Sequence, residues 1–256
     1  MLQNIIELSS QYHLSNLNWS LAFLGALFLG MGKAGIKGIG VVIVTIMALV
    51  FGGKASTGIL LPLMVLADSF AVIYYHRHTQ WKILLKLLPS MILGVLVGVW
   101  FGNDISEHLF KQIMAVFILL TVIVMVWMDR KKNLGIPKHW VLSGSLGFLS
   151  GFTSMIGNLA GSFANIYFLA MRLPKNEFIG TAAWLFFIIN VFKLPFHIFV
   201  WKTVTLKSFT VDLFLIPAVI LGFYIGVKLV KLINNQLFRK FILAVTAIGS
   251  LLILLK

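Results

Sequence analysis

The feature that most limits the fold is a series of apolar stretches that runs along almost the whole chain, separated by short and mostly basic connections. Five stretches lie on each side of a basic segment: Trp19–Gly30, Ile36–Phe51, Ser56–Tyr75, Ile83–Phe101, Phe110–Trp127, Trp140–Gly151, Ile156–Met171, Phe178–Val200, Phe209–Val227 and Leu237–Leu255. A membrane-crossing helix needs about 20 apolar residues, and the last three stretches of each half reach or approach that length. Hydrophobic residues make up 60% of the chain and its mean hydropathy is +1.00, whereas roughly half is normal for a soluble domain. We therefore predict an all-α, polytopic membrane protein.

The composition also narrows the function. The net charge of +14 comes from lysines and arginines in short loops, where such residues orient a membrane protein, so we expect membrane lipid and no nucleic acid as a partner. The chain has no cysteine, which excludes disulfides and thiolate ligands. It also lacks a GxxxxGKS/T phosphate loop, an HExxH motif and any cluster of acidic residues and histidines. We expect no enzyme, no cofactor and no bound metal, and any uphill transport must draw on an ion gradient.

The two halves of the chain carry similar markers in the same order. The matching pairs lie 122 residues apart at first and 128 apart later: Gly35/Gly157, Gly58/Gly180, Asp68/Asn190, Pro89/Pro217, Gly94/Gly222, Gly98/Gly226, Phe110/Phe238 and Lys111/Arg239. Glycine, proline and charge coincide less easily by chance than apolar residues do. We infer an internal duplication, with an N-terminal lead (1–18), a first membrane repeat (19–128), a basic cytoplasmic linker (129–139) and a second membrane repeat (140–256).

The first two stretches of each half are short and meet at glycines, so they form either short tilted helices or a re-entrant hairpin. If each half crosses the membrane an odd number of times, the halves are inverted, and one side carries thirteen loop lysines and arginines against five on the other. Four crossings per half would give ten against eight. Because basic residues accumulate on the cytoplasmic side, we predict two inverted-topology repeats, each with such a broken pair plus three membrane helices, and both termini outside the cytoplasm. Inverted repeats around broken helices are typical of secondary transporters.

The two glycine-rich breaks hold the candidate site. Residues 30–40 read GMGKAGIKGIG, and residues 151–161 read GFTSMIGNLAG. We expect the breaks to face each other near mid-membrane, because glycines let the backbone approach a ligand and a restarting helix points N–H groups at an anion. The predicted substrate-binding residues are Lys33, Gly35, Lys37, Ser154, Gly157, Asn158, Asn190 and Lys193, and Asp68 is the candidate for coupling.

Each of these charged residues also has a simpler explanation. A charge at bilayer depth is a functional candidate by default, but Lys33 and Lys37 could instead extend to the headgroups from a helix end. Lys193 could pair with Asp68 or reach a membrane surface. Asp68 could be the counter-ion of a lysine and nothing more, and His197 is expected to be interfacial.

Several motifs are shared with one known family. They are GMGKAGIKG in the first break, KASTG at 54–58, LLPLMVLAD at 60–68, YYHRHTQW at 74–81, MIGN at 155–158, LPKNEFIGT at 173–181 and NVFKLP at 190–195. Over about residues 20–255 the chain resembles the TauE/SafE family of sulfite and organosulfonate exporters. The resemblance implies a transporter in the bacterial cytoplasmic membrane that exports small sulfur-containing anions such as sulfite or sulfoacetate, coupled to protons. At the second break Ser154, Asn158 and Ala160 replace glycines often seen in the family.

Other functions remain open from the residues alone. The sequence does not show the direction of transport, so uptake is an alternative to export. A passive channel for another small organic anion is a second alternative, and it would need no Asp68. A membrane scaffold or assembly factor is a different class of function, and it has no need for unpaired lysines at bilayer depth, so the positions of Lys33 and Lys193 discriminate. The glycine-rich helix faces would permit a homodimer, but they fit internal packing equally well.

Overall fold

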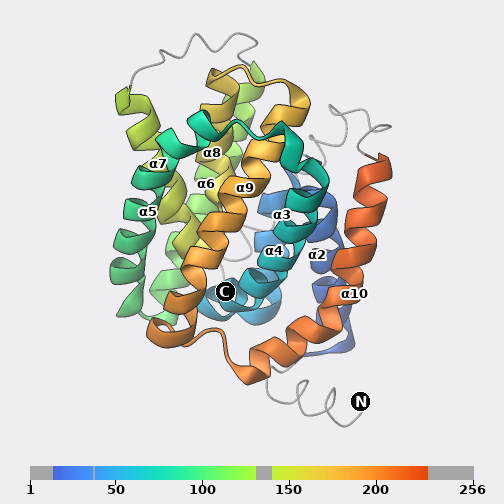
Figure 1. Ribbon diagram of the computed structural model, residues 1–256. Helices are drawn as coiled ribbons and strands as arrows, with labels where there is room; N and C mark the ends of the chain where they lie inside the picture. The colour runs from blue at the N-terminus through green and yellow to red at the C-terminus, as the bar shows by residue number, and fades with distance from the viewer. Residues whose placement is uncertain (1–13, 37, 131–139, 230–256) are drawn as a thin grey trace.

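A computed structural model describes residues 14–36, 38–130 and 140–229, and within these it contains helices and no strand (Figure 1). The helices are α2 (Asn16–Lys33), α3 (Ile39–Phe51), α4 (Gly53–Tyr75), the 3-10 turn η1 (His76–His78), α5 (Trp81–Asn103), α6 (Glu107–Arg130), α7 (Trp140–Gly157), α8 (Ala160–Ala170), α9 (Lys175–Pro195), the π-helical turn η2 (Phe196–Val200) and α10 (Leu206–Leu229). The predicted all-α class is confirmed.

Five helical segments are long and apolar enough to cross a membrane. They are Gly53–His78, Trp81–Asn103, Glu107–Val124, Asn176–Val200 and Leu206–Leu229. The chain is therefore an integral membrane protein. The predicted last stretch of the second half and most of the basic linker lie outside the described residues, as do Lys37 and most of the N-terminal lead.

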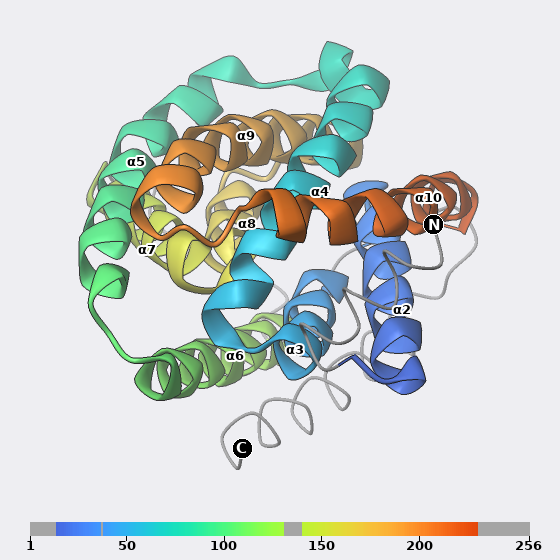
Figure 2. The same ribbon diagram turned by 90° about the horizontal axis from the view of Figure 1, so that it is seen from below.

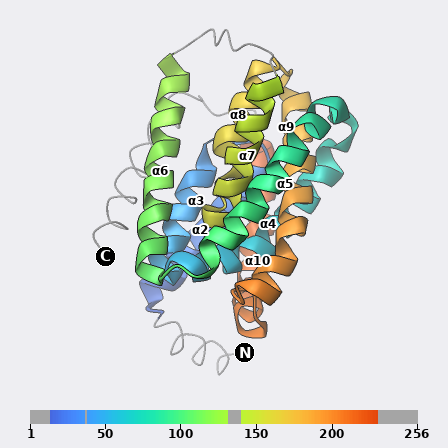
Figure 3. The ribbon, with the colours of Figure 1, turned by 90° about the vertical axis from the view of Figure 1, so that its left-hand side faces the viewer.

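The first two helices of each half are separate and fold back on each other, so each half begins with a helix pair and not with one continuous helix. Gly25 of α2 lies against Met47 of α3, and Gly32 lies against Ile39, so α3 folds back along α2. In the second half α8 packs against α7. Figure 1 shows α2 beginning at the lower end of the bundle and α7 beginning at the upper end, and Figure 3 shows the same from the side.

Each of these helix pairs packs against a long helix from the other half of the chain. Helix α10 packs along α2 and α5 packs along α7 (Figure 2). In both pairs a glycine on each helix lets the backbones touch: Gly94 at the Phe148 carbonyl, Gly151 at the Met91 carbonyl, Gly222 at the Leu27 carbonyl and Gly30 at the Val219 carbonyl. A side chain at any of these glycines would collide with the facing backbone, which is the close packing typical of small residues in membrane helices. Gly94 and Gly222 are one of the predicted repeat pairs.

Helices α4 and α9 cross the centre in opposite directions. Gly58, near the start of α4, lies against Thr203 beyond the end of α9, and Gly180, near the start of α9, lies against the carbonyl of Tyr75 at the end of α4. Because Gly58 and Gly180 are a predicted repeat pair, this antiparallel arrangement is what inverted repeats would produce. The inversion itself remains our interpretation.

The longer helices surround the short ones. Helix α3 has eleven of its 13 residues buried, whereas α5 exposes large apolar side chains such as Leu93 and Trp100 on its outer surface. An outward apolar face suits contact with lipid tails. The breaks before α3 and α8 are irregular backbone, which a membrane protein tolerates only where it is shielded from lipid. The fold thus places both glycine-rich breaks in the interior.

Candidate functional site

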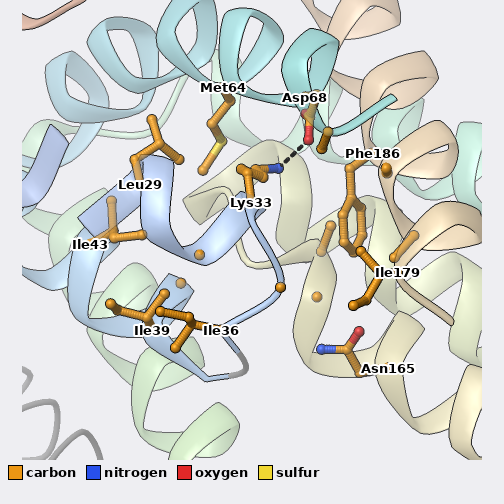
Figure 4. A pocket seen from close by; sticks show the side chains of 18 of the residues that line it. Leu29, Lys33, Ile36, Ile39, Ile43, Met64, Asp68, Asn165, Ile179 and Phe186 are labelled. Atoms are coloured by element: carbon orange, nitrogen blue, oxygen red, sulfur yellow. Dashed lines mark ion pairs between the residues drawn. The ribbon is translucent and has the colours of Figure 1, made fainter. Parts of the chain in front are cut away.

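A cavity of about 170 Å³ lies between the two breaks (Figure 4). Its walls come from the end of α2, the start of α3, the middle of α4, the α7–α8 junction and α9. Most of the lining is apolar, and its polar side chains are Lys33, Asp68, Ser154, Asn158, Asn165 and Asn190. An apolar pocket with a few convergent polar groups is the usual form of a small-molecule site.

Lys33 is the last residue of α2, and its ammonium points into the bundle. It forms an ion pair with Asp68 of α4, with 2.6 Å between Nζ and Oδ1. The carboxylate is fully buried and the lysine side chain is 16% exposed. The ammonium also lies 5.1 Å from the centre of the Phe186 ring, at cation–π distance. Lys33 therefore has its partners inside the bundle and needs no lipid headgroup. The ion pair also shows that Asp68 is the counter-ion of a lysine.

Lys193 is a fully buried lysine on α9, and among the described residues its ammonium contacts only neutral acceptors. It donates to the Ser154 carbonyl at 2.8 Å, the Ser154 hydroxyl at 3.1 Å, Asn158 Oδ1 at 2.6 Å and Asn190 Oδ1 at 3.4 Å. Neither predicted alternative for Lys193 is realised, because it makes no direct pair with Asp68 and does not reach a surface. Charge-assisted hydrogen bonds of this kind are strong, but they leave the positive charge without an anion in contact.

Asn190 links the Lys33–Asp68 ion pair to the hydrogen bonds of Lys193. Its amide nitrogen donates to Asp68 Oδ2 at 2.7 Å, while its amide oxygen accepts from Lys193. Asp68 and Asn190 are a predicted repeat pair, so the centre of the network lies where the two halves meet. One continuous chain of polar contacts therefore runs from the first break, at Lys33, to the second, at Asn158.

The backbone at both breaks takes conformations that open a helix toward the cavity. Gly35 and Gly38 have φ values of 113° and 87°, in a region that favours glycine. At the second break Asn158 has φ 55°, which asparagine tolerates better than most residues. Helices α3 and α8 then begin at the cavity wall, and no side chain caps either N-terminus. The N–H groups of an uncapped first turn and the helix dipole favour an anion there.

The predicted site residues do not all lie at the cavity. Lys193 sits behind the wall and reaches it through Ser154 and Asn158. Gly157 is packed against Leu159 and against Met114 of α6 and does not line the cavity. The sequence analysis missed Asn165 and Phe186, which do line it. Asn165 carried a signal, since it is a polar residue one turn after Gly161 in an apolar helix.

His197 corrects another expectation. It was predicted to be interfacial, but its side chain is fully buried and its Nδ1 is hydrogen-bonded to the Thr203 hydroxyl at 2.8 Å. The prediction failed because Trp201 and Thr203 pack around this residue beyond the end of α9, and the spacing of residues along one helix does not show that.

The site as a whole has a positive balance. Two lysines face one carboxylate, and two uncapped helix N-termini add partial positive charge. Fold and site together define a polytopic membrane protein with a central cavity suited to an anion. The family model for the sulfite exporter TauE/SafE family matches residues 18–253, and the chain belongs to that family of membrane transporters. No curated protein and no solved structure matches the chain.

Proposed function

We propose that the protein is a secondary transporter that exports small sulfur-containing anions, such as sulfite or an organosulfonate like sulfoacetate. The observation that carries this proposal is the positive balance around the central cavity, where Lys33 and the start of α3 approach the same space from one half and Asn158 from the other. A membrane scaffold has no use for two lysines held in the interior, so the site favours transport.

The proposed binding step exchanges one anion for another at Lys33. The ammonium can leave Asp68 and bind a sulfite or sulfonate oxygen in the cavity, with the free N–H groups at Gly38 and Ile39 as further donors. A lysine acts as a compact point charge and suits a pyramidal or tetrahedral oxyanion, although arginine would bind it bidentately. Lys193 holds Asn158 and Asn190 in place from behind.

The proposed coupling step uses the carboxylate that is left behind. Once Lys33 has turned to the substrate, Asp68 keeps only the hydrogen bond from Asn190. A buried carboxylate without a cation is costly, so a proton neutralises it. Competition of the proton, Lys33 and the anion for one site would couple the anion flux to the pH gradient, as a symport or as an antiport.

The test is the flux of sulfite and sulfoacetate in proteoliposomes, with and without a pH gradient, for the wild type and Lys33→Ala. Lys228→Ala is the matched control, because it removes the same charge from an exposed lysine that lies over the Tyr224 ring, away from the cavity. We expect gradient-driven flux that Lys33→Ala abolishes and Lys228→Ala leaves unchanged. Normal transport by Lys33→Ala would refute the anion site.

A second variant separates coupling from binding. Asp68→Asn should still move anions down their own gradient but should no longer respond to the pH gradient. If it keeps both flux and pH dependence, the coupling role of Asp68 is wrong. A wild type that conducts anions without any response to pH would favour a passive channel, and the orientation of the gradient that drives net flux distinguishes uptake from export.

A further inference from the structure

The end of α9 nearest Lys193 has an unusual conformation. The helix passes Pro195 and continues as the π-helical turn η2. Single π-turns within α-helices are rare and often occur at functional sites. His197 lies in this turn, one turn after Lys193 and therefore about 6 Å further along the axis.

His197 has a nitrogen that nothing in the described part of the chain satisfies. Its Nδ1 contacts the Thr203 hydroxyl, but its Nε2 is buried and has no hydrogen-bond partner among the described residues. A buried polar atom without a partner costs about 1–3 kcal/mol, so it calls for an explanation. A neutral imidazole can donate or accept at this atom, and it can therefore contact a passing oxyanion or its proton.

The side chain that covers His197 is Trp201. The two rings meet edge to face at 5.1 Å, and the indole makes a similar contact with Phe110 of α6 at 5.6 Å. Its Nε1–H donates to the Val99 carbonyl of α5 at 3.1 Å. At Gly102 of α5 any side chain would collide with the indole ring. The indole thus fills the space between three helices that approach one another at this end of the bundle.

A second cavity of about 730 Å³ lies at this end of the bundle and has the Trp201 indole in its wall. Its lining includes Trp201, Thr203, three lysines (Lys54, Lys202 and Lys207) and one carboxylate, Glu107 at the start of α6. The central cavity is lined by residues near the start of α9, such as Ile179, whereas this one lies beyond the end of the same helix. Helix α9, which runs the height of the bundle in Figure 1, separates the two.

We propose that the transport pathway continues from Lys193 past His197 into this second cavity, and that Trp201 is the gate that closes it in this conformation. His197 Nε2 is the polar contact for the small oxyanion between the two cavities. The identity of the anion rests on the proposed function, but the position of the pathway does not. The proposal adds a positioning residue, His197, and a gate residue, Trp201, to the central site.

The absence of cysteine from the chain gives a direct test that needs no transport. Single cysteines are introduced as Asn165→Cys in the central cavity, Thr203→Cys in the second cavity and His197→Cys between them. Each variant in sealed vesicles is treated from one face or the other with a membrane-impermeant, anionic methanethiosulfonate. We expect Asn165→Cys and Thr203→Cys to react from opposite faces.

The gate is tested at the position between the cavities. A closed gate leaves the open state at about 10% or less, so Trp201→Ala should raise the modification rate of His197→Cys from the Thr203 face about tenfold or more. Trp201→Phe keeps a ring in place, should keep the slow rate and serves as the conservative control. Equal rates in the Trp201→Ala and Trp201 backgrounds would overturn the gate, and labelling of Asn165→Cys and Thr203→Cys from the same face would overturn the pathway.

Transport assays separate this proposal from the function on which it draws. His197→Ala should slow anion flux, and His197→Gln, which keeps a polar amide, should restore part of it. If sulfite and sulfoacetate do not move at all but the labelling pattern is as expected, the pathway stands and the proposed substrates are wrong. If both anions move normally in His197→Ala, the contact at Nε2 is wrong, whatever the labelling shows.

Discussion

The ion pair between Lys33 and Asp68 allows a sharp prediction about stability, because its two partners are buried to different extents. The carboxylate is fully buried, whereas the lysine side chain is 16% exposed and borders the cavity. Lys33→Met therefore leaves a fully buried carboxylate that keeps, among the described residues, only the Asn190 amide as a donor. Asp68→Asn leaves an ammonium that can turn into the cavity.

The expected free energies of unfolding follow from this asymmetry. Removing one partner of a buried ion pair costs about 3–5 kcal/mol, and we expect Lys33→Met to fall in that range. Asp68→Asn should cost less, about 1–3 kcal/mol, the usual penalty of losing a hydrogen bond to a charged group. The double variant Lys33→Met/Asp68→Asn should be more stable than Lys33→Met alone, because it leaves no unpaired charge.

The measurement is a double-mutant cycle on thermal or denaturant unfolding of the purified protein in detergent at neutral pH, with Lys228→Met as the control for loss of an exposed lysine. The cycle should give a favourable coupling energy between positions 33 and 68. Two results would refute the reasoning: Asp68→Asn proving the less stable of the single variants, or the double variant proving the least stable of the three. Restored stability without restored flux in the double variant would separate the structural role of the pair from its role in binding.

Three further predictions concern other parts of the structure. Gly94→Ala should lower the free energy of unfolding by about 1–3 kcal/mol, because the new methyl group collides with the α7 backbone. Gly144→Ala is the control: nothing lies within 4 Å of a Cβ built there, so it should be neutral or stabilising by up to about 1 kcal/mol. Thermal unfolding of the two variants checks both expectations. Asn158→Asp should keep the contact with Lys193 but place a negative charge at the cavity, so the KM for sulfite should rise about tenfold or more, and an unchanged KM would contradict an anion site there. Asp212→Leu should stabilise the protein by about 1–3 kcal/mol in the same unfolding assay, because both carboxylate oxygens of this buried residue have no hydrogen-bond partner within the described chain.

The sequence was sufficient for the class of fold, and it pointed to the two breaks between which the central cavity lies. Length and hydropathy of the apolar stretches are local properties, and they predicted the membrane helices that the structure contains. The breaks were visible because glycines interrupt apolar runs in both halves. The lysines stood out because a charge is costly at bilayer depth, and Lys33 does line the cavity.

The partners of those charges were beyond the sequence. Lys193 was expected to pair with Asp68 or reach a surface, yet it binds neutral oxygens across a helix junction, and Asn190 makes the link to the carboxylate. Which side chains meet depends on the rotation of each helix about its axis and on the antiparallel register of α4 and α9. Neither quantity is encoded in the spacing of residues along one helix.

The same reason explains the errors at Gly157 and His197. Gly157 belongs to the glycine-rich break, but the direction in which α7 ends turns it toward α6. His197 lies beyond a proline near an apolar end, and it is buried because Trp201 and Thr203 pack around it. By itself the sequence determined that the chain spans the membrane, where its helices break and that Asp68 and Lys193 are charges inside apolar helices, although it did not single out the buried Asp212. The tertiary structure alone decided which of those groups touch, because contacts between distant segments depend on helix packing, whereas hydropathy and helix-breaking residues act on each segment separately.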